Sequence, residues 1–96
     1  MAAYLVANVR VTDPARYEEY RQRVPAVVAA HGGRFLVRGG TIHPVEGDIG
    51  LDRIVVLEFA SMEALRGFYD APEYAPLLAM RLESTESRVA FVEGVA

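Results

Sequence analysis

The chain has 96 residues, a formal net charge of −3, no cysteine and no tryptophan. One small domain over residues 1–96 fits this length, and 52% hydrophobic residues argue against disorder. Interleaved charges without a basic stripe argue against nucleic acid, and no apolar run reaches the ~20 residues that span a bilayer. Because the start also lacks a basic segment typical of a signal peptide, we expect a cytoplasmic protein without a membrane partner.

The first predicted elements are a strand over residues 4–11 and a helix that follows it. Apolar and polar side chains alternate through this strand, as they do when one face is buried. Asp13 or Thr12 can cap the helix, and Pro14 takes a first-turn position where a missing N–H costs nothing. Pro25 lies inside the helical pattern and predicts a kink.

The rest of the chain predicts further strands and two shorter helices. A glycine pair at 39–40 permits a bulge after the second strand, which then continues beyond it. Ser61 can cap a helix that breaks before Pro72. The remaining predicted elements are strands over 34–38, 41–45, 53–59 and 88–93, and a helical segment over 73–82.

This order of elements, βαββαβ, predicts an α+β fold of the ferredoxin-like kind. Its four-stranded antiparallel sheet has the strand order 4-1-3-2, and both helices cover one face. The alternation leaves six large apolar residues on the uncovered face: Tyr4, Val6, Leu36, Ile54, Val56 and Val92. A monomer rarely exposes so large an apolar patch, so we expect a homodimer through the open sheet face.

Arg38 and Glu58 have the parity of this open face and lie on neighbouring predicted strands. They can form a structural ion pair, with the glycines making the bulge. Alternatively, Arg38 binds the anionic group of a ligand and Glu58 orients it. A third interpretation is an exposed arginine without a role.

Several stretches of the sequence resemble a known family, the domain of unknown function 1330, over about residues 4–94. The two most specific stretches are HGGRFLVRGG and YDAPEYAPL. The resemblance implies the dimeric α/β-barrel superfamily, which includes cofactor-independent monooxygenases, haem-degrading enzymes, small isomerases and ligand-sensing domains. Haem degradation of the well-known kind and quinone monooxygenation both lean on tryptophan, which this chain lacks. The aromatic residues Tyr17, Tyr20, Phe68 and Tyr74 leave monooxygenation open.

Other candidate residues have a structural and a functional interpretation. His31 ends the first helix, where it can bond the last carbonyls or act as a general base in a cleft. Tyr17 and Tyr20 share one helix face and form either core or the wall of a ligand cavity. Arg81 can pair with Glu73 or with a ligand.

Two functions follow from these residues. The first is a cofactor-free enzyme of the isomerase or monooxygenase type that acts on a small organic acid or phenol. In it, Arg38 binds the anion, His31 or Glu58 moves the proton, and Asn8 shapes the pocket together with the two tyrosines. The alternative is a non-catalytic dimer that binds a small metabolite. No nucleotide cofactor or metal is expected, because the glycine pairs match no phosphate-binding motif and the two histidines lack ligand spacing.

Overall fold

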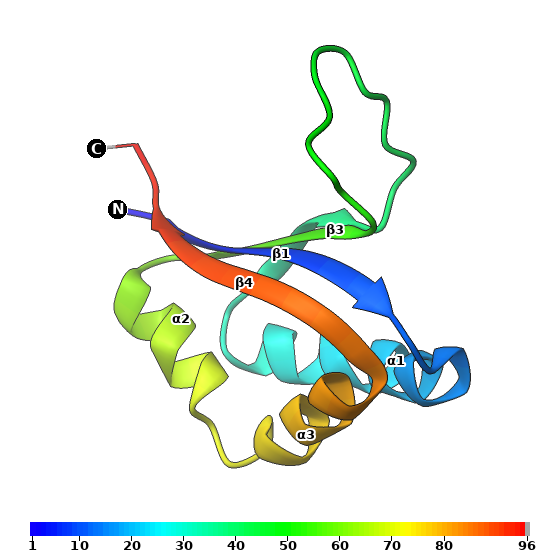
Figure 1. Ribbon diagram of the computed structural model, residues 1–96. Helices are drawn as coiled ribbons and strands as arrows, with labels where there is room; N and C mark the ends of the chain where they lie inside the picture. The colour runs from blue at the N-terminus through cyan, green and yellow to red at the C-terminus, as the bar shows by residue number, and fades with distance from the viewer. Residues whose placement is uncertain (96) are drawn as a thin grey trace.

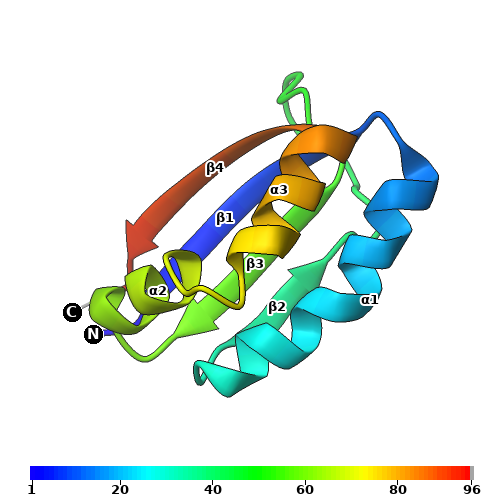
Figure 2. The same cartoon turned by 90° about the horizontal axis from the view of Figure 1, so that it is seen from below.

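The computed structural model describes residues 1–95 as a four-stranded sheet with helices on one face. Its elements in chain order are β1 (Ala3–Val11), α1 (Pro14–Ala30), β2 (Arg34–Arg38), β3 (Ile54–Phe59), α2 (Met62–Tyr69), α3 (Ala75–Ser84) and β4 (Thr85–Glu93). The strands lie in the order β2-β3-β1-β4, and all neighbours are antiparallel. Figures 1 and 2 show the three helices beneath the sheet. The ferredoxin-like α+β fold and the strand order are therefore confirmed.

Local signals in the sequence set the ends of the helices. The Asp13 carboxylate accepts a hydrogen bond from the backbone N–H of Arg16 at 3.2 Å, which caps α1. This helix runs through Pro25 as one α-helix and ends before Gly32, whose φ of +76° suits glycine. Ser61 caps α2 in the same way, with its hydroxyl 3.1 Å from the N–H of Ala64.

The core lies between the sheet and the helices. Alternate residues of β1 and β3 point down into it, as the period of two requires. Aromatic rings from α2 and the segment before α3 pack against them, with Phe68 and Tyr74 at 4.6 Å between ring centroids. The core residues exposed by 2% or less are Ala3, Val28, Phe59, Leu65, Phe68, Tyr74 and Leu77.

A bulge in β2 changes which side chains face the helices. Phe35 pairs with Leu57, but Val37 pairs with Val56, so two residues of β2 oppose one of β3. The bulge lies before Val37 and not at the glycines 39–40, where the sequence predicts it. Because an inserted residue reverses the alternation, Arg38 lies on the helix-covered face. Its predicted position on the open face was wrong.

Residues 39–53 form an extended arm between β2 and β3. The predicted strand over 41–45 is absent, since the arm contains no strand. Figure 1 shows the arm extending from the sheet on the side away from the helices. The end of the arm that leads into β3 is held to β1 by Asn8, whose side-chain oxygen accepts a hydrogen bond from the Asp52 N–H at 2.8 Å.

The open face of the sheet is apolar, as the sequence predicts. Its side chains include Val6, Leu36 and Val92, which are 36%, 44% and 47% exposed. The bulge adds Val37 to this face.

Within residues 1–95, no helix has both the length and the apolar character needed to cross a bilayer.

Candidate functional site

A cavity lies between the inner face of the sheet and helices α1 and α3. It encloses about 40 Å³, which is room for a few water molecules or a small anion, and opens to solvent at one end. Apolar residues of the sheet form its floor. Its polar lining consists of three tyrosines and four arginines: Tyr17, Tyr20, Tyr74, Arg21, Arg38, Arg53 and Arg81. No aspartate, glutamate or histidine lines it among the described residues.

Hydrogen bonds and ring contacts link the tyrosines to one another and to an arginine. The Arg53 Nε donates a hydrogen bond to the Tyr17 hydroxyl at 3.2 Å, and its guanidinium lies 5.6 Å from the centre of that ring. The ring of Tyr17 stacks on that of Tyr20 at 5.7 Å. The hydroxyls of Tyr20 and Tyr74 are 2.9 Å apart, so α1 is hydrogen-bonded to the start of α3.

Tyr20 is the protonated, uncharged partner in this hydroxyl pair. Burial raises the pKa of the Tyr20 hydroxyl, and the neighbouring Tyr74 hydroxyl raises it further. Tyr20 therefore keeps its proton at neutral pH. It can donate or accept a hydrogen bond in the cavity, but it adds no negative charge.

Three of the lining arginines have no carboxylate within 4.0 Å among residues 1–95: Arg38, Arg53 and Arg81. Arg38 donates instead to the backbone carbonyl of Arg21 and lies 4.7 Å over the ring of Phe35. Arg81 is 5% exposed and donates from Nη2 to the Tyr69 hydroxyl at 3.0 Å. The cavity is therefore bordered by positive charge that the described side chains do not neutralise.

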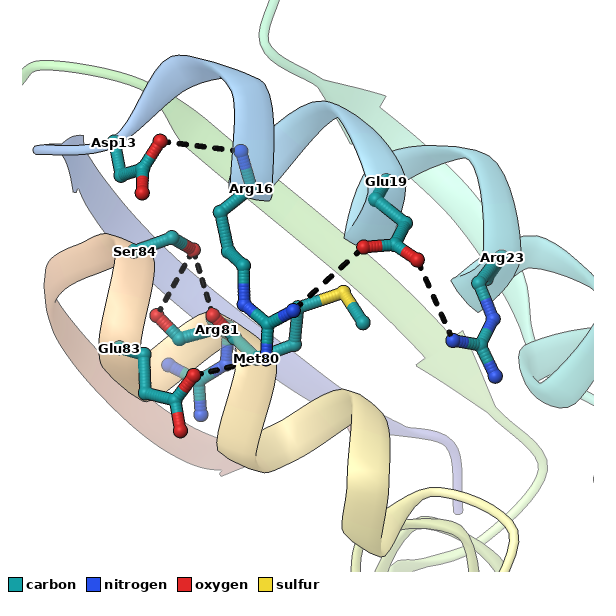
Figure 3. Close-up of polar contacts among 8 residues, drawn as sticks. All are labelled: Asp13, Arg16, Glu19, Arg23, Met80, Arg81, Glu83 and Ser84. Atoms are coloured by element: carbon teal, nitrogen blue, oxygen red, sulfur yellow. Dashed lines mark hydrogen bonds and ion pairs between the residues drawn. The ribbon is translucent and has the colours of Figure 1, made fainter.

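The carboxylates near these helices pair elsewhere. Figure 3 shows Arg16 of α1 reaching Glu83 of α3, at 2.9 Å, and also Glu19 of its own helix, at 3.7 Å. The fourth lining arginine, Arg21, pairs with Glu18 at 2.8 Å. These ion pairs are exposed to solvent, and the one between Arg16 and Glu83 joins α1 to α3.

The structure brings three of the six predicted site residues to one cavity. Tyr17, Tyr20 and Arg38 line it. His31 lies at the end of α1, where its Nε2 is 3.0 Å from the Glu73 carboxylate and its ring meets the edge of Phe68. Glu73, which the sequence suggests as a partner of Arg81, is therefore bonded to His31 instead.

The other two predicted site residues, Asn8 and Glu58, lie on the open face of the sheet. Glu58 accepts hydrogen bonds from Arg34 at 2.7 Å and from the Tyr4 hydroxyl at 3.1 Å. Both bonds lower the pKa of the Glu58 carboxyl, the arginine more strongly. The predicted ion pair between Arg38 and Glu58 was wrong, because the bulge places these residues on opposite faces of the sheet.

Sequence reasoning missed Arg53 as a site residue and did not place Arg81 in the cavity. Arg53 directly precedes an apolar strand, and a polar residue at that position is typical of a strand end that faces solvent. Arg81 does have a signal: Leu77 and Ser84 lie four residues before and three after it, on the buried side of α3. Within residues 1–95, no group of three histidine, aspartate or glutamate side chains could hold a metal ion.

Comparison with known proteins gives a family and a fold. The model of the family described as Domain of unknown function (DUF1330) matches residues 2–95, so the chain belongs to this family and the resemblance is confirmed. No curated protein matches the chain.

Three solved structures of low sequence identity share the fold. A protein of unknown function from Rhodopseudomonas palustris is 16% identical, with a TM-score of 0.75 over 99% of this chain and 83% of that chain. A dimeric ferredoxin-like protein of unknown function from Jannaschia sp. is 15% identical, with a TM-score of 0.70 over 98% and 100%. SnoaB from Streptomyces nogalater, a cofactor-independent oxygenase, is 17% identical, with a TM-score of 0.64 over 99% and 94%.

Proposed function

We propose that this member of the DUF1330 family is a cofactor-free enzyme of the isomerase or monooxygenase type. It acts on a small organic acid or phenol, which it binds in the cavity between the sheet and helices α1 and α3. The observation behind this proposal is the lining of the cavity, in which arginines without carboxylate partners stand beside tyrosine hydroxyls. Such a lining favours an anion over a neutral or cationic ligand.

The reactions in this class share an anionic organic species. An isomerase passes through an enolate, and oxygenation without a cofactor requires an electron-rich enolate or phenolate that reacts with O₂. Fixed cations and hydroxyl donors stabilise such an oxyanion in a site that excludes water. Tyr17 is placed for this role: its oxygen accepts a bond from Arg53, so its own proton is free to be donated to the ligand.

Among residues 1–95, the lining contains no carboxylate or imidazole that could remove a proton from the substrate. We therefore propose that the reacting group of the substrate has lost its proton to solvent before it enters, as the phenolate of an acidic phenol or as an enolate. Proton transfer by His31 or Glu58 remains a prediction, and in a single copy both residues lie away from the cavity.

The outer end of the cavity, formed by Arg21, Arg38 and Arg53, would admit the ligand. Arg38 is exposed and the other two are half-buried. Their long side chains can swing outward, which would enlarge the enclosed 40 Å³ for a ligand bigger than a small anion.

We also propose that the protein is a homodimer that associates through the open sheet face. The apolar side chains on that face support this assembly, as does the dimeric relative from Jannaschia sp.. The arm over 39–53 extends on the same side and would flank the partner.

The alternative function is a non-catalytic protein that binds a small metabolite anion. It is favoured by the missing proton acceptor, since a binding site needs none. SnoaB, a cofactor-independent oxygenase, has the same fold, but fold alone does not decide between the two functions.

The test is a thermal-shift screen of small acids and phenols, followed by turnover of each hit in aerated buffer without added cofactor. In an enzyme, Tyr17→Phe should lower kcat more than tenfold and leave Kd within about threefold, whereas Arg53→Met should raise Kd. Glu46→Gln, an exposed change in the arm, is the control. Binding without turnover would support the metabolite-binding alternative, and turnover unchanged in both variants would contradict the proposed site.

A further inference from the structure

Arg81 is the charged side chain that the fold buries most completely. Among residues 1–95 it is the one charged residue that the protein almost completely covers, with 5% of its surface exposed. Its neighbours on the same side of α3 are Leu77, Met80 and Ser84, each exposed by 5% or less. The helix therefore holds the guanidinium at the inner end of the cavity, away from solvent.

The groups around this guanidinium are hydroxyls. Arg81 donates to the Tyr69 hydroxyl at 3.0 Å and lies near the hydroxyls of Tyr74 and Tyr20. Tyr20 supplies no negative charge in return, since burial raises the pKa of its hydroxyl and it keeps its proton. The closest carboxylates along the chain are committed elsewhere, Glu83 to Arg16 and Glu86 to Arg10.

Arg81 thus has a hydrogen-bond partner in Tyr69, but its charge has no counter-charge. No buried side-chain nitrogen or oxygen in the described chain lacks a hydrogen-bond partner. A buried cation without a counter-charge is nonetheless destabilising, and an apolar side chain of similar volume would serve the core better. A ligand that brings a negative charge removes this penalty.

The hydroxyls also leave a proton for a ligand. Tyr69 accepts from Arg81 and so orients the guanidinium, but it lies outside the cavity lining. Tyr20 and Tyr74 share one hydrogen bond, in which one hydroxyl donates and the other keeps a free proton. An oxyanion at this end would meet a planar cation and one O–H donor.

We propose that Arg81, with Tyr20 and Tyr74, forms a binding subsite for a carboxylate group of the ligand. This inference rests on the proposed function and adds an orientation to it. The carboxylate lies at the inner end against Arg81, and the reacting oxygen faces Arg53 and Tyr17 at the outer end. The class of ligand is therefore a small acid with a second oxygen function, such as a hydroxy, keto or phenolic acid. A carboxylate matches the two-pronged guanidinium, and the enclosed 40 Å³ suits a group of that size.

The experiment compares acetate with acetamide, which has the same shape but no charge. Both are titrated into the ¹⁵N-labelled full chain at constant ionic strength, and the arginine Nε–Hε signals are followed. Acetate should shift the Arg81 signal in a saturable way, and acetamide should not. An equal response to both would overturn the subsite.

Two variants separate the subsite from a purely structural role. Arg81→Met should weaken acetate binding at least tenfold, and without acetate it should melt at the same or a higher temperature than the wild type. Arg66→Met, which removes an exposed arginine over Phe91, is the matched control and should bind acetate like the wild type. A lower melting temperature of Arg81→Met with unchanged acetate affinity would show that Arg81 only supports the fold.

The outcomes also separate this inference from the proposed function. If benzoate binding is lost in Arg53→Met but kept in Arg81→Met, the cavity binds acids and the inner subsite is wrong. If the wild type binds neither acetate nor benzoate, the proposed function and the subsite both fail.

Discussion

The hydroxyls of Tyr20 and Tyr74 lie 2.9 Å apart and join α1 to the start of α3 on the helix-covered side of the sheet. Tyr74 is 2% exposed, so its hydroxyl has little access to solvent. This bridge fixes the distance between the two helices that enclose the cavity. The positive lining and the hydroxyl donors of the site both depend on this arrangement.

Removing one hydroxyl of this bridge should cost more than removing both. Tyr20→Phe deprives the buried Tyr74 hydroxyl of its partner and should lower the free energy of unfolding by about 1–3 kcal/mol. The double variant Tyr20→Phe/Tyr74→Phe should recover part of that loss, because no hydroxyl then lacks a partner. Urea denaturation of the four proteins gives the coupling. Strictly additive losses would show that the bond contributes nothing.

Glu18 should contribute to stability only above acidic pH. The hydrogen bond from Arg21 lowers the pKa of the Glu18 carboxyl from 4.5 to about 2 in the folded protein. The folded state then binds the proton less readily than the unfolded chain, so the contribution is full above pH 4.5 and is lost as the pH falls towards 2. It should be small, because both partners are largely exposed to solvent.

The measurement is the urea midpoint of the wild type and of Glu18→Gln as a function of pH. The difference between their urea midpoints should be measurable at pH 6 and should disappear by pH 2. Glu46→Gln, at an exposed glutamate of the arm without an ion pair in residues 1–95, should show no such difference. A difference that is constant over this range would rule out the linkage.

Two glycine-to-alanine changes should have opposite effects. A Cβ on Gly33 would lie 2.5 Å from the ring of Phe59, which is 1% exposed and cannot move aside. Gly33→Ala should therefore lower the free energy of unfolding by about 1–3 kcal/mol. Gly67 lies within α2 with open space at its Cβ position, so Gly67→Ala should stabilise by about 0.5–1 kcal/mol. Urea denaturation measures both, and a neutral Gly33→Ala would mean that the close contact is absent.

A charge on the open sheet face should dissociate the proposed dimer. Val56 pairs with Val6 near the centre of that face, so Val56→Asp would place a carboxylate in the interface. At micromolar concentration the wild type should sediment with twice the mass of the 10.6 kDa chain, and the variant as a single chain. Ala29→Asp, on the exposed side of α1, should stay dimeric. A wild type that sediments as one chain would refute the dimer.

Much of the fold follows from local periodicity. The alternation in β1 correctly places Leu5, Ala7 and Val9 in the core, because the strand is regular and pairs on both sides. The predicted caps at Asp13 and Ser61 are confirmed, since each depends only on a side chain and an amide three residues away.

The site was less predictable, for two physical reasons. One inserted residue in β2 reverses the faces that follow it, and nothing in FLVRGG indicates that the bulge precedes Val37 rather than occupying the glycines. Arg38 was therefore assigned to the wrong face. The second reason is that Arg53 and Arg81 reach the cavity from different elements, and their meeting depends on how α3 packs on the sheet.

The most direct measurement compares benzoate with benzamide by isothermal titration of the wild type, with the binding site mapped by NMR. A cavity lined by unpaired arginines should bind benzoate at least tenfold more tightly than its neutral amide, with shifts at Tyr17, Tyr20 and the Nε–Hε group of Arg53. Equal affinity for the two compounds would contradict an anion site between the sheet and helices α1 and α3. So would NMR signal shifts on benzoate binding that are confined to residues outside the cavity.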